Sequence, residues 1–460
     1  MADGLQESVD KLREAGVGEA AVATFRDAYE RLRSGESGAL AESDLEPVES
    51  LPDADELPEP DEETARSVLS QAIVVKLNGG LGTSMGMDRA KSLLEVKDGQ
   101  SFLDLIARQV LDLRERTGAR LPLVLMNSFA TREDSLAALA AHDGLGTDLP
   151  ADFVQNKVPK LRADDLRPVR WPEDPDLEWA PPGHGDLYAA LETSGLLDDL
   201  LAGGFRWAFV SNSDNLGAVL EPRILAWIAR EELPFVMEAA DRTEADRKGG
   251  HLARRRDGGF VLREIAQTPD EDVDAFQDVT RHRYFNTNTL WVDLQALRTL
   301  LDERDGVLGL PMIVNRKTVD PADKESTPVI QLETAMGAAI DVFDGAQALR
   351  VPRSRFVPVK TTNDLLVLRS DAYDVDEAGR LTLAGDRDAA PLVDLDPRHY
   401  KLIADFDARL PSGPPSLVAC DRLTVEGDVT FGAGVVCRGE VTVRAEGGPV
   451  HLEDGTEFDG

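Results

Sequence analysis

The sequence predicts an α/β protein with a mostly parallel, doubly wound, Rossmann-like sheet and a small parallel β-helix at the C-terminus. Three observations support this prediction. Apolar, strand-like runs alternate with helical stretches between about residues 71 and 350, the pattern of a parallel sheet with right-handed crossover helices. The first strand-like run leads directly into a glycine-rich turn. Beyond about residue 385, short Val-rich segments broken by Gly and Asp repeat, as in the coils of a β-helix.

The composition fits a soluble protein of the reducing cytoplasm. The chain has 460 residues, 42% of them hydrophobic, which is enough for two or three domains with a full core. It has no run of about 18 apolar residues, so no membrane span is predicted. The N-terminus is acidic and mixed, unlike a signal peptide. Two cysteines, Cys420 and Cys437, favour a cytoplasmic protein over a disulfide scaffold, and no His/Cys spacing resembles a zinc site.

The net charge is strongly negative. With 85 acidic and 50 basic residues it is −35 at pH 7, which would repel nucleic acid and acidic membrane surfaces. We therefore expect no nucleic-acid or membrane partner, and a surface suited to solubility or salt tolerance. A polyphosphate ligand would require local clustering of the cations. The candidates are Lys76, Arg89, Lys91, Arg353, Arg355 and Lys360.

Residues 1–70 precede the predicted sheet. Within them, residues 5–33 place apolar side chains every three or four positions, which predicts one or two amphipathic helices. Residues 34–66 are rich in Glu, Asp, Pro and Ser and predict an extended, acidic, solvated connector. We expect an α/β domain to follow over residues 71–385 and a β-helix-like domain over residues 386–460.

The predicted strand at residues 73–77 leads into a candidate phosphate-binding loop. Its β-branched and aliphatic residues suit a strand buried on both faces. Four glycines follow, namely Gly79, Gly80, Gly82 and Gly86. Such turns expose backbone N–H groups that accept phosphate oxygens, and Lys91 could add a mobile charge. The spacing fits neither a P-loop nor the dinucleotide fingerprint, and a tight strand-to-helix connection is the alternative.

Strand-like and helical stretches then alternate along the chain. The expected strands cover residues 121–126, 153–155, 207–211 and 235–239. The expected helices cover residues 101–117, 131–142, 185–200 and 221–232.

Polar side chains follow the carboxyl ends of two of these expected strands. Asn127 and Ser128 follow one strand, and Asn212, Asp214 and Asn215 follow another. In doubly wound sheets, ligands bind beyond the carboxyl ends of the strands. An Asp at such a position is a usual ligand of Mg²⁺ in phosphate chemistry, which makes Asp214 the candidate. Asx turns or helix N-caps are the alternative.

Two further segments carry side chains suited to a sugar phosphate. His184 lies between Gly183 and Gly185 just before an expected helix, where free N–H groups and an imidazole suit a phosphate or a hydroxyl. Asn286 and Asn288 precede an expected strand, and their amides offer the donors and acceptors that sugar hydroxyls need. Turn or strand-edge asparagines are the alternative for this pair.

Residues 351–365 concentrate three cations, Arg353, Arg355 and Lys360, in an otherwise acidic chain. Two prolines hold this segment rigid, which argues against the alternative of a solvated basic strand. An apolar helical run follows, so the segment ends in another strand-to-helix transition.

Residues 416–443 carry the repeated Val-rich strands. They fit about two or three coils of a parallel β-helix, fewer than would be stable alone, so we expect them to dock on the rest of the chain. A small antiparallel meander is the alternative. No catalytic constellation lies in this segment.

Taken together, these stretches resemble the eukaryotic-type UTP–glucose-1-phosphate uridylyltransferase family. The matching stretches are KLNGGLGTSMG at 76–86, KS at 91–92, LMNSF at 125–129, PPGHGDLY at 181–188, SNSDNLG at 211–217, KGG at 248–250, EIAQ at 264–267, FNTNTLW at 285–291, VIQLETAMGAAI at 329–340 and VPRSRFVPVKTTNDLL at 351–366. The resemblance implies an α/β nucleotidyltransferase core with a C-terminal β-helix. It also implies a Mg²⁺-dependent reaction of UTP with glucose 1-phosphate that yields UDP-glucose and pyrophosphate.

The resemblance further implies roles for individual residues by matching position. The nucleotide would be held by Leu77, Asn78, Gly79 and Gly80, with Met126, Gln155 and Gly183 around the uracil. Glucose 1-phosphate would be held by His184, Asn212, Gly250 and Asn288. Asp214 would bind Mg²⁺, and the catalytic cations Lys91 and Lys360 would bind the phosphates.

The sequence departs from the family pattern at three places. Arg89 and Ala90 replace the usual Gly-Pro before the Lys of the KS pair, and FVQNKVPK surrounds Gln155 where an FNQS-like run is usual. His251 follows KGG where a small hydroxyl residue is common, and we expect it to alter the surroundings of the sugar. In some relatives the C-terminal segment oligomerises, so self-association through it stays open.

The implied chemistry requires placement and charge neutralisation, because the attacking sugar phosphate is already ionised. We expect the segments 76–92, 181–188, 211–217 and 351–362, which carry Lys91, His184, Asp214 and Lys360, to converge at one rim of the sheet. Two alternatives stay open. The sugar could be galactose 1-phosphate or an N-acetylhexosamine 1-phosphate, or the chain could be a non-catalytic UDP-sugar-binding protein.

Overall fold

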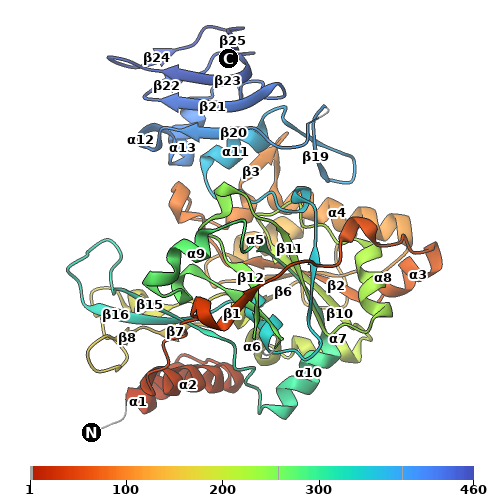
Figure 1. Ribbon diagram of the computed structural model, residues 1–460, viewed down its shortest axis with the longest axis vertical. Helices are drawn as coiled ribbons and strands as arrows, with labels where there is room; N and C mark the ends of the chain where they lie inside the picture. The colour runs from red at the N-terminus through yellow and green to blue at the C-terminus, as the bar shows by residue number, and fades with distance from the viewer. Residues whose placement is uncertain (1–3, 257, 386) are drawn as a thin grey trace.

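A large mixed sheet organises the structure, a computed structural model that describes residues 4–256, 258–385 and 387–460. Figure 1 shows the C-terminal strands at one end of the long axis and helices α1 (Gly4–Glu14) and α2 (Glu19–Arg33) at the other. In the described residues no helix combines the length and apolar character needed to cross a membrane.

The central sheet has ten strands among the described residues, seven of them in the order β1-β12-β14-β10-β2-β5-β6. They are β1 (Leu45–Pro47), β2 (Ala72–Asn78), β5 (Leu123–Asn127), β6 (Asp152–Val154), β10 (Trp207–Asn212), β11 (Phe235–Asp241), β12 (His251–Arg255), β13 (Phe260–Arg263), β14 (Tyr284–Asp293) and β17 (Gln347–Arg350). Strands β10, β2, β5 and β6 pair in parallel, as do β11 and β17. The α/β prediction is confirmed.

One long strand runs against this direction. Strand β14 pairs antiparallel with both β10 and β11 and lies between them. The hairpin of β12 and β13 precedes β14 and reverses the chain, so β14 enters the sheet from the opposite end. The predicted mostly parallel arrangement therefore describes one half of the sheet, and the other half is mixed.

Helices cover both faces of the sheet. In β2 the side chains alternate, because successive strand residues point to opposite faces. Val74 packs in one buried cluster with residues of α3, α4 and α8, whereas Ile73 and Val75 pack in another with residues of α6, α7 and α10. Both faces of β2 are therefore covered, as a doubly wound sheet requires.

Helices are present in the expected stretches 101–117, 131–142 and 221–232, and others lie where none was expected. Their bounds are α3 (Glu62–Leu69), α4 (Phe102–Thr117), α5 (Arg132–Leu139), α6 (Leu187–Thr193), α7 (Leu196–Ala202), α8 (Pro222–Arg230), α9 (Val273–Gln277), α10 (Leu294–Glu303), α11 (Thr362–Arg369), α12 (Pro397–Tyr400) and α13 (Ile403–Ala408). The single helix expected over 185–200 is wrong. Gly195, with φ of +76°, ends the first helix and starts the second.

The N-terminal region is attached to the sheet. The two expected helices are present as α1 and α2, but residues 34–66 are not simply a solvated connector. Leu45 lies opposite Arg255 in the pairing of β1 with β12, and α3 begins after an Asp61 cap. The acidic composition gave no sign of α3. It did not predict the pairing of β1 with β12 either, because the two strands lie far apart in the sequence.

The C-terminal strands all pair in parallel. The sheet order is β20-β21-β23-β25, with a second pair of β22 and β24. The remaining strands are β3 (Glu95–Lys97), β4 (Gln100–Ser101), β7 (Val158–Pro159), β8 (Leu161–Arg162), β9 (Trp179–Ala180), β15 (Met312–Thr318), β16 (Pro328–Thr334), β18 (Tyr373–Val375), β19 (Leu381–Leu383), β20 (Leu392–Leu395), β21 (Cys420–Glu426), β22 (Val429–Thr430), β23 (Val436–Arg444), β24 (Val450–His451) and β25 (Glu457–Asp459). The antiparallel meander is therefore excluded.

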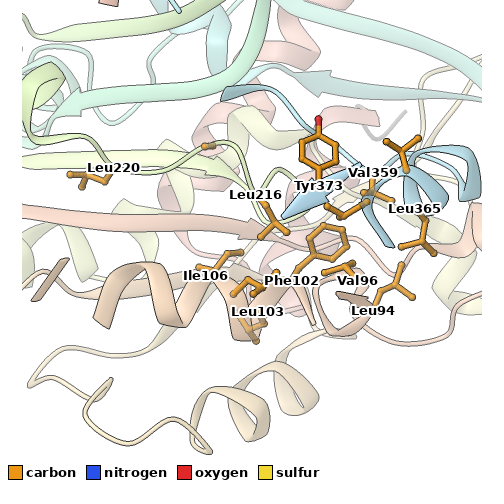
Figure 2. Close-up of a cluster of buried hydrophobic side chains, with 14 of the residues drawn as sticks. Leu94, Val96, Phe102, Leu103, Ile106, Leu216, Leu220, Val359, Leu365 and Tyr373 are labelled. Atoms are coloured by element: carbon orange, nitrogen blue, oxygen red, sulfur yellow. The ribbon is translucent and has the colours of Figure 1, made fainter. Parts of the chain in front are cut away.

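A buried cluster joins the C-terminal part to the main body beneath the candidate site. Figure 2 shows Phe102 of α4 beside Val96, with Leu216 and Val359 close by. Leu94, Leu216 and Val359 are each buried in this cluster. They lie within three residues of Lys91, Asp214 and Lys360, respectively, so apolar packing fixes the backbone from which those polar side chains project.

Candidate active site

The glycine-rich loop after β2 closes on itself. Gly82 and Gly86 have φ of +66° and +77°, and they flank a short 3-10 turn. The N–H of Lys91 donates to the carbonyl of Gly80 at 3.0 Å. The loop therefore returns to its own start and places Lys91 at the carboxyl end of β2.

Lys91 meets Asp214 across the sheet edge. Lys91 Nζ lies 2.6 Å from Asp214 Oδ2, and the two side chains are 17% and 20% exposed. Strands β2 and β10 are parallel, with Leu77 opposite Asn212, and the N–H of Ser213 donates to the carbonyl of Leu77. Two segments far apart in sequence thus end at one rim.

The third segment reaches the same rim through main-chain contacts. The N–H of Val359 donates to the carbonyl of Asp214 at 3.2 Å. The side chain of Asn215 donates to the carbonyl of Arg355 at 3.1 Å and accepts from the N–H of Val357 at 2.9 Å. Lys360 follows directly and its side chain is exposed. The expected convergence of Lys91, Asp214 and the Lys360 segment is present.

Two of the other candidate cations are buried, so the expectation that they gather at a phosphate site is wrong for Lys76 and Arg355. Lys76 is buried, and its Nζ donates to Ser211 Oγ at 2.7 Å and to a carbonyl. Burial lowers the pKa of Lys76 to about 7. Arg355 is buried in a bidentate pair with Glu238 at 2.7 and 2.6 Å. Arg353 pairs with Asp246 at 2.6 Å.

The residues expected around the nucleotide base lie beside the glycine loop. Met126 is buried in β5 opposite Leu77 of β2. The side chain of Gln155 packs on Gly79, since a Cβ there would lie 2.7 Å from Gln155 Oε1. Gly80, which is expected to contact the nucleotide, lies in the same loop.

Asn78 can reach a ligand only through its main chain. Its side chain is buried and donates to Asn127 Oδ1 at 2.7 Å and to Ser135 Oγ at 2.8 Å. This polar network lies beneath the loop and holds the end of β2 against α5. The sequence alone did not distinguish the roles of side chain and backbone at this position.

The His184 loop presents a neutral hydrogen-bond donor. The N–H of Met336 donates to His184 Nδ1 at 3.0 Å, so the ring proton is carried by Nε2. Burial lowers the pKa of His184 to about 4, so the ring stays neutral at pH 7. Gly183 has φ of +79°, and a Cβ there would lie 2.4 Å from the carbonyl oxygen of Thr334. Glycine is required to bring this loop so close to β16.

The residues expected around the sugar lie on the opposite side of the rim. The N–H of Asn286 in β14 donates to the carbonyl of Gly250 at 3.2 Å. The side chain of Asn286 donates to Asn288 Oδ1 at 2.9 Å and its carbonyl oxygen accepts from the N–H of Asn288. Asn288 has φ of +56°, so this pair is held in an unusual backbone conformation.

Glu264 packs against Gly250, an expected sugar residue, and was not named as a candidate from the sequence. A Cβ on Gly250 would lie 2.4 Å from Glu264 Oε1, so the carboxyl packs directly on that glycine. Burial raises the pKa of Glu264 to about 7, and the charge of Lys360 opposes the shift. The carboxyl of Glu264 is therefore close enough to Lys360 for their charges to interact. The EIAQ stretch at 264–267 was the available sequence signal, but the contact of Glu264 with Gly250 forms only in the folded chain.

His251 does not face the sugar side, contrary to expectation. Its ring is buried and stacks on His282 with 3.8 Å between the centroids. His282 Nε2 lies 3.0 Å from Glu42 Oε1, in the segment that precedes β1. His251 therefore belongs to the contact between the N-terminal region and the sheet.

Comparison with known proteins decides the family. Residues 22–438 match the family model described as UTP--glucose-1-phosphate uridylyltransferase. The protein of that name from Hordeum vulgare is 40% identical over 457 residues, which cover 98% of this chain and 94% of the relative. The one from Saccharomyces cerevisiae is 42% identical over 393 residues, with 85% and 77% covered.

The chain belongs to the UTP--glucose-1-phosphate uridylyltransferase family.

Solved structures of uridylyltransferases share the fold along the full chain. A variant of UDP-glucose pyrophosphorylase from Leishmania major, solved in complex with UDP-glucose, has a TM-score of 0.92 and 45% identity, and covers 100% of this chain and 98% of that chain. UDP-glucose phosphorylase from Trypanosoma brucei has a TM-score of 0.90 and 46% identity, with 99% and 98% covered. The architecture described above is therefore that of the uridylyltransferase family.

Two buried carboxyls should make stability depend on pH near neutrality. Burial raises the pKa of Asp186 to about 7 although it accepts from Asn156, and Glu264 has a similar pKa. Both groups titrate at about 4 in an unfolded chain, so the folded state binds extra protons between about pH 4 and 7. The free energy of unfolding should fall as pH rises through about 7.

Urea unfolding at pH 5.5 and pH 8.5 measures this dependence. Asp186→Asn and Glu264→Gln should each flatten the decline, whereas Glu325→Gln, at an exposed position, should leave it as in the wild type. An equal decline in all four proteins would contradict the assigned pKa values.

Proposed function

We propose that this chain joins UTP and glucose 1-phosphate to form UDP-glucose, with release of pyrophosphate. The order of strands supports this. Of the expected sugar residues, Asn288 lies on β14, Gly250 directly before β12 and Asn212 at the end of β10. Asp214 follows β10, and Lys91 follows β2. Of the expected base residues, Met126 lies on β5 and Gln155 directly after β6, whereas Gly183 and His184 lie in the loop that contacts β16. Neighbouring strands are about 4.8 Å apart, so this order presents sugar, phosphate and base sites in the sequence in which UDP-glucose carries those groups.

The reaction is an in-line displacement at the α-phosphorus of UTP. A phosphate oxygen of glucose 1-phosphate forms the new O–P bond, the bond to the bridging oxygen of the β-phosphate breaks, and pyrophosphate leaves with that electron pair. The nucleophile is already ionised, so no general base is needed, and orientation supplies up to about 7–11 kcal/mol of barrier lowering. His184, as a neutral donor, can bind a phosphate oxygen without changing the net charge.

Lys91 and Lys360 have the role of neutralising charge. Glucose 1-phosphate and UTP are both polyanions, and the chain itself carries a net charge of −35. Lys91 is held by Asp214 at the rim, and exposed Lys360 directly follows Val359, whose N–H donates to the carbonyl of Asp214. We infer that both side chains bind phosphate oxygens in the transition state, where one such electrostatic group is worth about 10²–10³ in rate.

We also propose that Asp214 holds Mg²⁺ together with the substrate phosphates. In the described part of the chain no three His, Cys, Asp or Glu side chains form a metal-binding group. One carboxylate suits Mg²⁺, which is usually bound through one or two carboxylates, waters and substrate phosphates. Asp214 presents such a carboxylate at the phosphate rim. When bound, the ion would offset negative charge on the phosphates.

The roles of Glu264 and Gly250 follow from the same layout. The carboxylate of Glu264 can accept hydrogen bonds from sugar hydroxyls, and Gly250 leaves room for it. Asn288 adds an amide on the neighbouring strand. We infer that these three residues orient the sugar ring, with Asn212 at the end of β10 closest to its phosphate.

We propose that the C-terminal strands form a short parallel β-helix. Leu423 lies opposite Val441 and Val429 opposite Val450, as successive coils would place them. Strand β25 is at the edge of its sheet, so self-association through this edge is part of the proposal. We also propose a cytoplasmic location, which the free thiols of Cys420 and Cys437 support. We place the domain limits near residues 70 and 385.

A pyrophosphate-release assay tests the proposed reaction. Release should require UTP, glucose 1-phosphate and Mg²⁺ together, and EDTA should stop it. Galactose 1-phosphate and N-acetylglucosamine 1-phosphate should give lower kcat/KM than glucose 1-phosphate. A higher kcat/KM with either would reassign the sugar, and tight binding of UDP-glucose without any release would mean a non-catalytic binding protein.

Replacement of Lys360 by Ala isolates the charge contribution. The side chain is exposed, so folding should be unaffected, while kcat should fall by about 10²–10³. Lys324→Ala, another exposed lysine, is the matched control and should turn over normally. Unchanged turnover in the Lys360 variant would remove that residue from the mechanism.

A further inference from the structure

Phe129 is an exposed aromatic side chain at the carboxyl edge of the sheet. It follows the end of β5 by two residues and is 70% exposed, more than any other large apolar side chain in the described part of the chain. Exposed aromatic rings on so charged a surface contribute nothing to the core. Single exposed apolar side chains are common on protein surfaces, so the neighbours of Phe129 decide whether it has a role.

Lys157 connects Phe129 with a second aromatic ring. Lys157 Nζ lies 5.7 Å from the centroid of Phe129 and 4.4 Å from that of Trp179, within the range of cation–π contacts. Among the described residues Lys157 forms no ion pair, although the chain has 85 acidic residues. Phe129, Lys157 and Trp179 are called the aromatic rim below.

The two aromatic rings differ in how far they are packed. Trp179 belongs to β9, which pairs with β7, and Lys11 of α1 lies 5.0 Å from its ring while pairing with Glu178. Phe129 has no comparable packing, as its exposure shows. The aromatic rim thus combines a partly buried ring, Trp179, with an exposed ring, Phe129.

The aromatic rim comes from the three segments that supply the expected uracil contacts. Phe129 is three residues after Met126, Lys157 two residues after Gln155, and Trp179 four residues before Gly183. The N–H of Gln155 donates to the carbonyl of Asn127 at 2.8 Å, which ties the first two segments together. Each segment that supplies an expected uracil contact therefore also supplies one member of the rim.

We propose that the aromatic rim is the outer wall of the nucleotide pocket and that Phe129 packs on the bound pyrimidine nucleotide. The proposal rests on the proposed function for the identity of the nucleotide. An aromatic ring gains affinity by stacking on a base or packing on a ribose, and Lys157 holds that ring toward Trp179 by cation–π attraction. Binding of the nucleotide covers a ring that is otherwise exposed to water.

Phe129→Ala tests the aromatic rim without disturbing the core. Stacking of one base on an aromatic ring corresponds to at least about a five-fold change in affinity, and we expect the Kd for UDP and the KM for UTP to rise about ten-fold. The Tm and the kcat at saturating UTP should match the wild type. Phe129→Trp should retain the wild-type Kd, and Lys157→Met should weaken binding less than Phe129→Ala.

Leu392→Ala is the matched control, because Leu392 is another exposed apolar side chain, at 53%, and lies on β20 away from the rim. It should leave the Kd for UDP unchanged. Equal Kd values in the wild type and Phe129→Ala would overturn the proposal, as would an equal rise in Phe129→Ala and Leu392→Ala.

Calorimetric titration with UDP separates this proposal from the proposed reaction, because binding requires no turnover. A wild-type protein that binds UDP but releases no pyrophosphate would refute the reaction, and the Phe129 comparison would still decide the rim. A wild-type protein that does not bind UDP would overturn both.

Discussion

The contact between Lys91 and Asp214 joins the two central parallel strands of the sheet at their carboxyl ends. It brings opposite charges to 2.6 Å at a rim that is only about one-fifth exposed. The rest of the site is arranged around it. The Lys360 segment attaches to the main chain of Asp214, and the sugar-side and base-side strands lie on either side. Under the proposed function, Lys91 binds the substrate phosphates directly and Asp214 binds them through Mg²⁺.

Apolar packing and buried ion pairs hold this rim in place from below. Leu94, Leu216 and Val359 pack in one cluster beneath it (Figure 2). Arg355 is buried against Glu238 and Glu221, and this fixes the segment that leads to Lys360. Removing one partner of such a pair would leave an unpaired buried charge and cost about 3–5 kcal/mol. The cations near the site therefore fall into two kinds, those that build it and those that face the substrate.

The sequence predicted the local parts of this arrangement better than the distant ones. The strand and loop at 72–86 were predictable, because apolar residues followed by glycines give a local signal. The direction of β14 was not, because it depends on a hairpin formed earlier in the chain. The burial of Arg355 against Glu238 was also not predictable, because the two residues lie 117 positions apart in the sequence. Glu264 escaped notice for the same reason, because its contact with Gly250 exists only in the folded chain.

A double-mutant cycle on Lys91 and Asp214 tests most directly whether the two side chains serve one substrate site. The measurement is kcat/KM for pyrophosphate release by the wild type, Lys91→Met, Asp214→Asn and the double variant. If they act as a unit, the double variant should lose little more than the worse single variant. Losses that simply multiply, as for independent sites, would contradict a shared site at this rim.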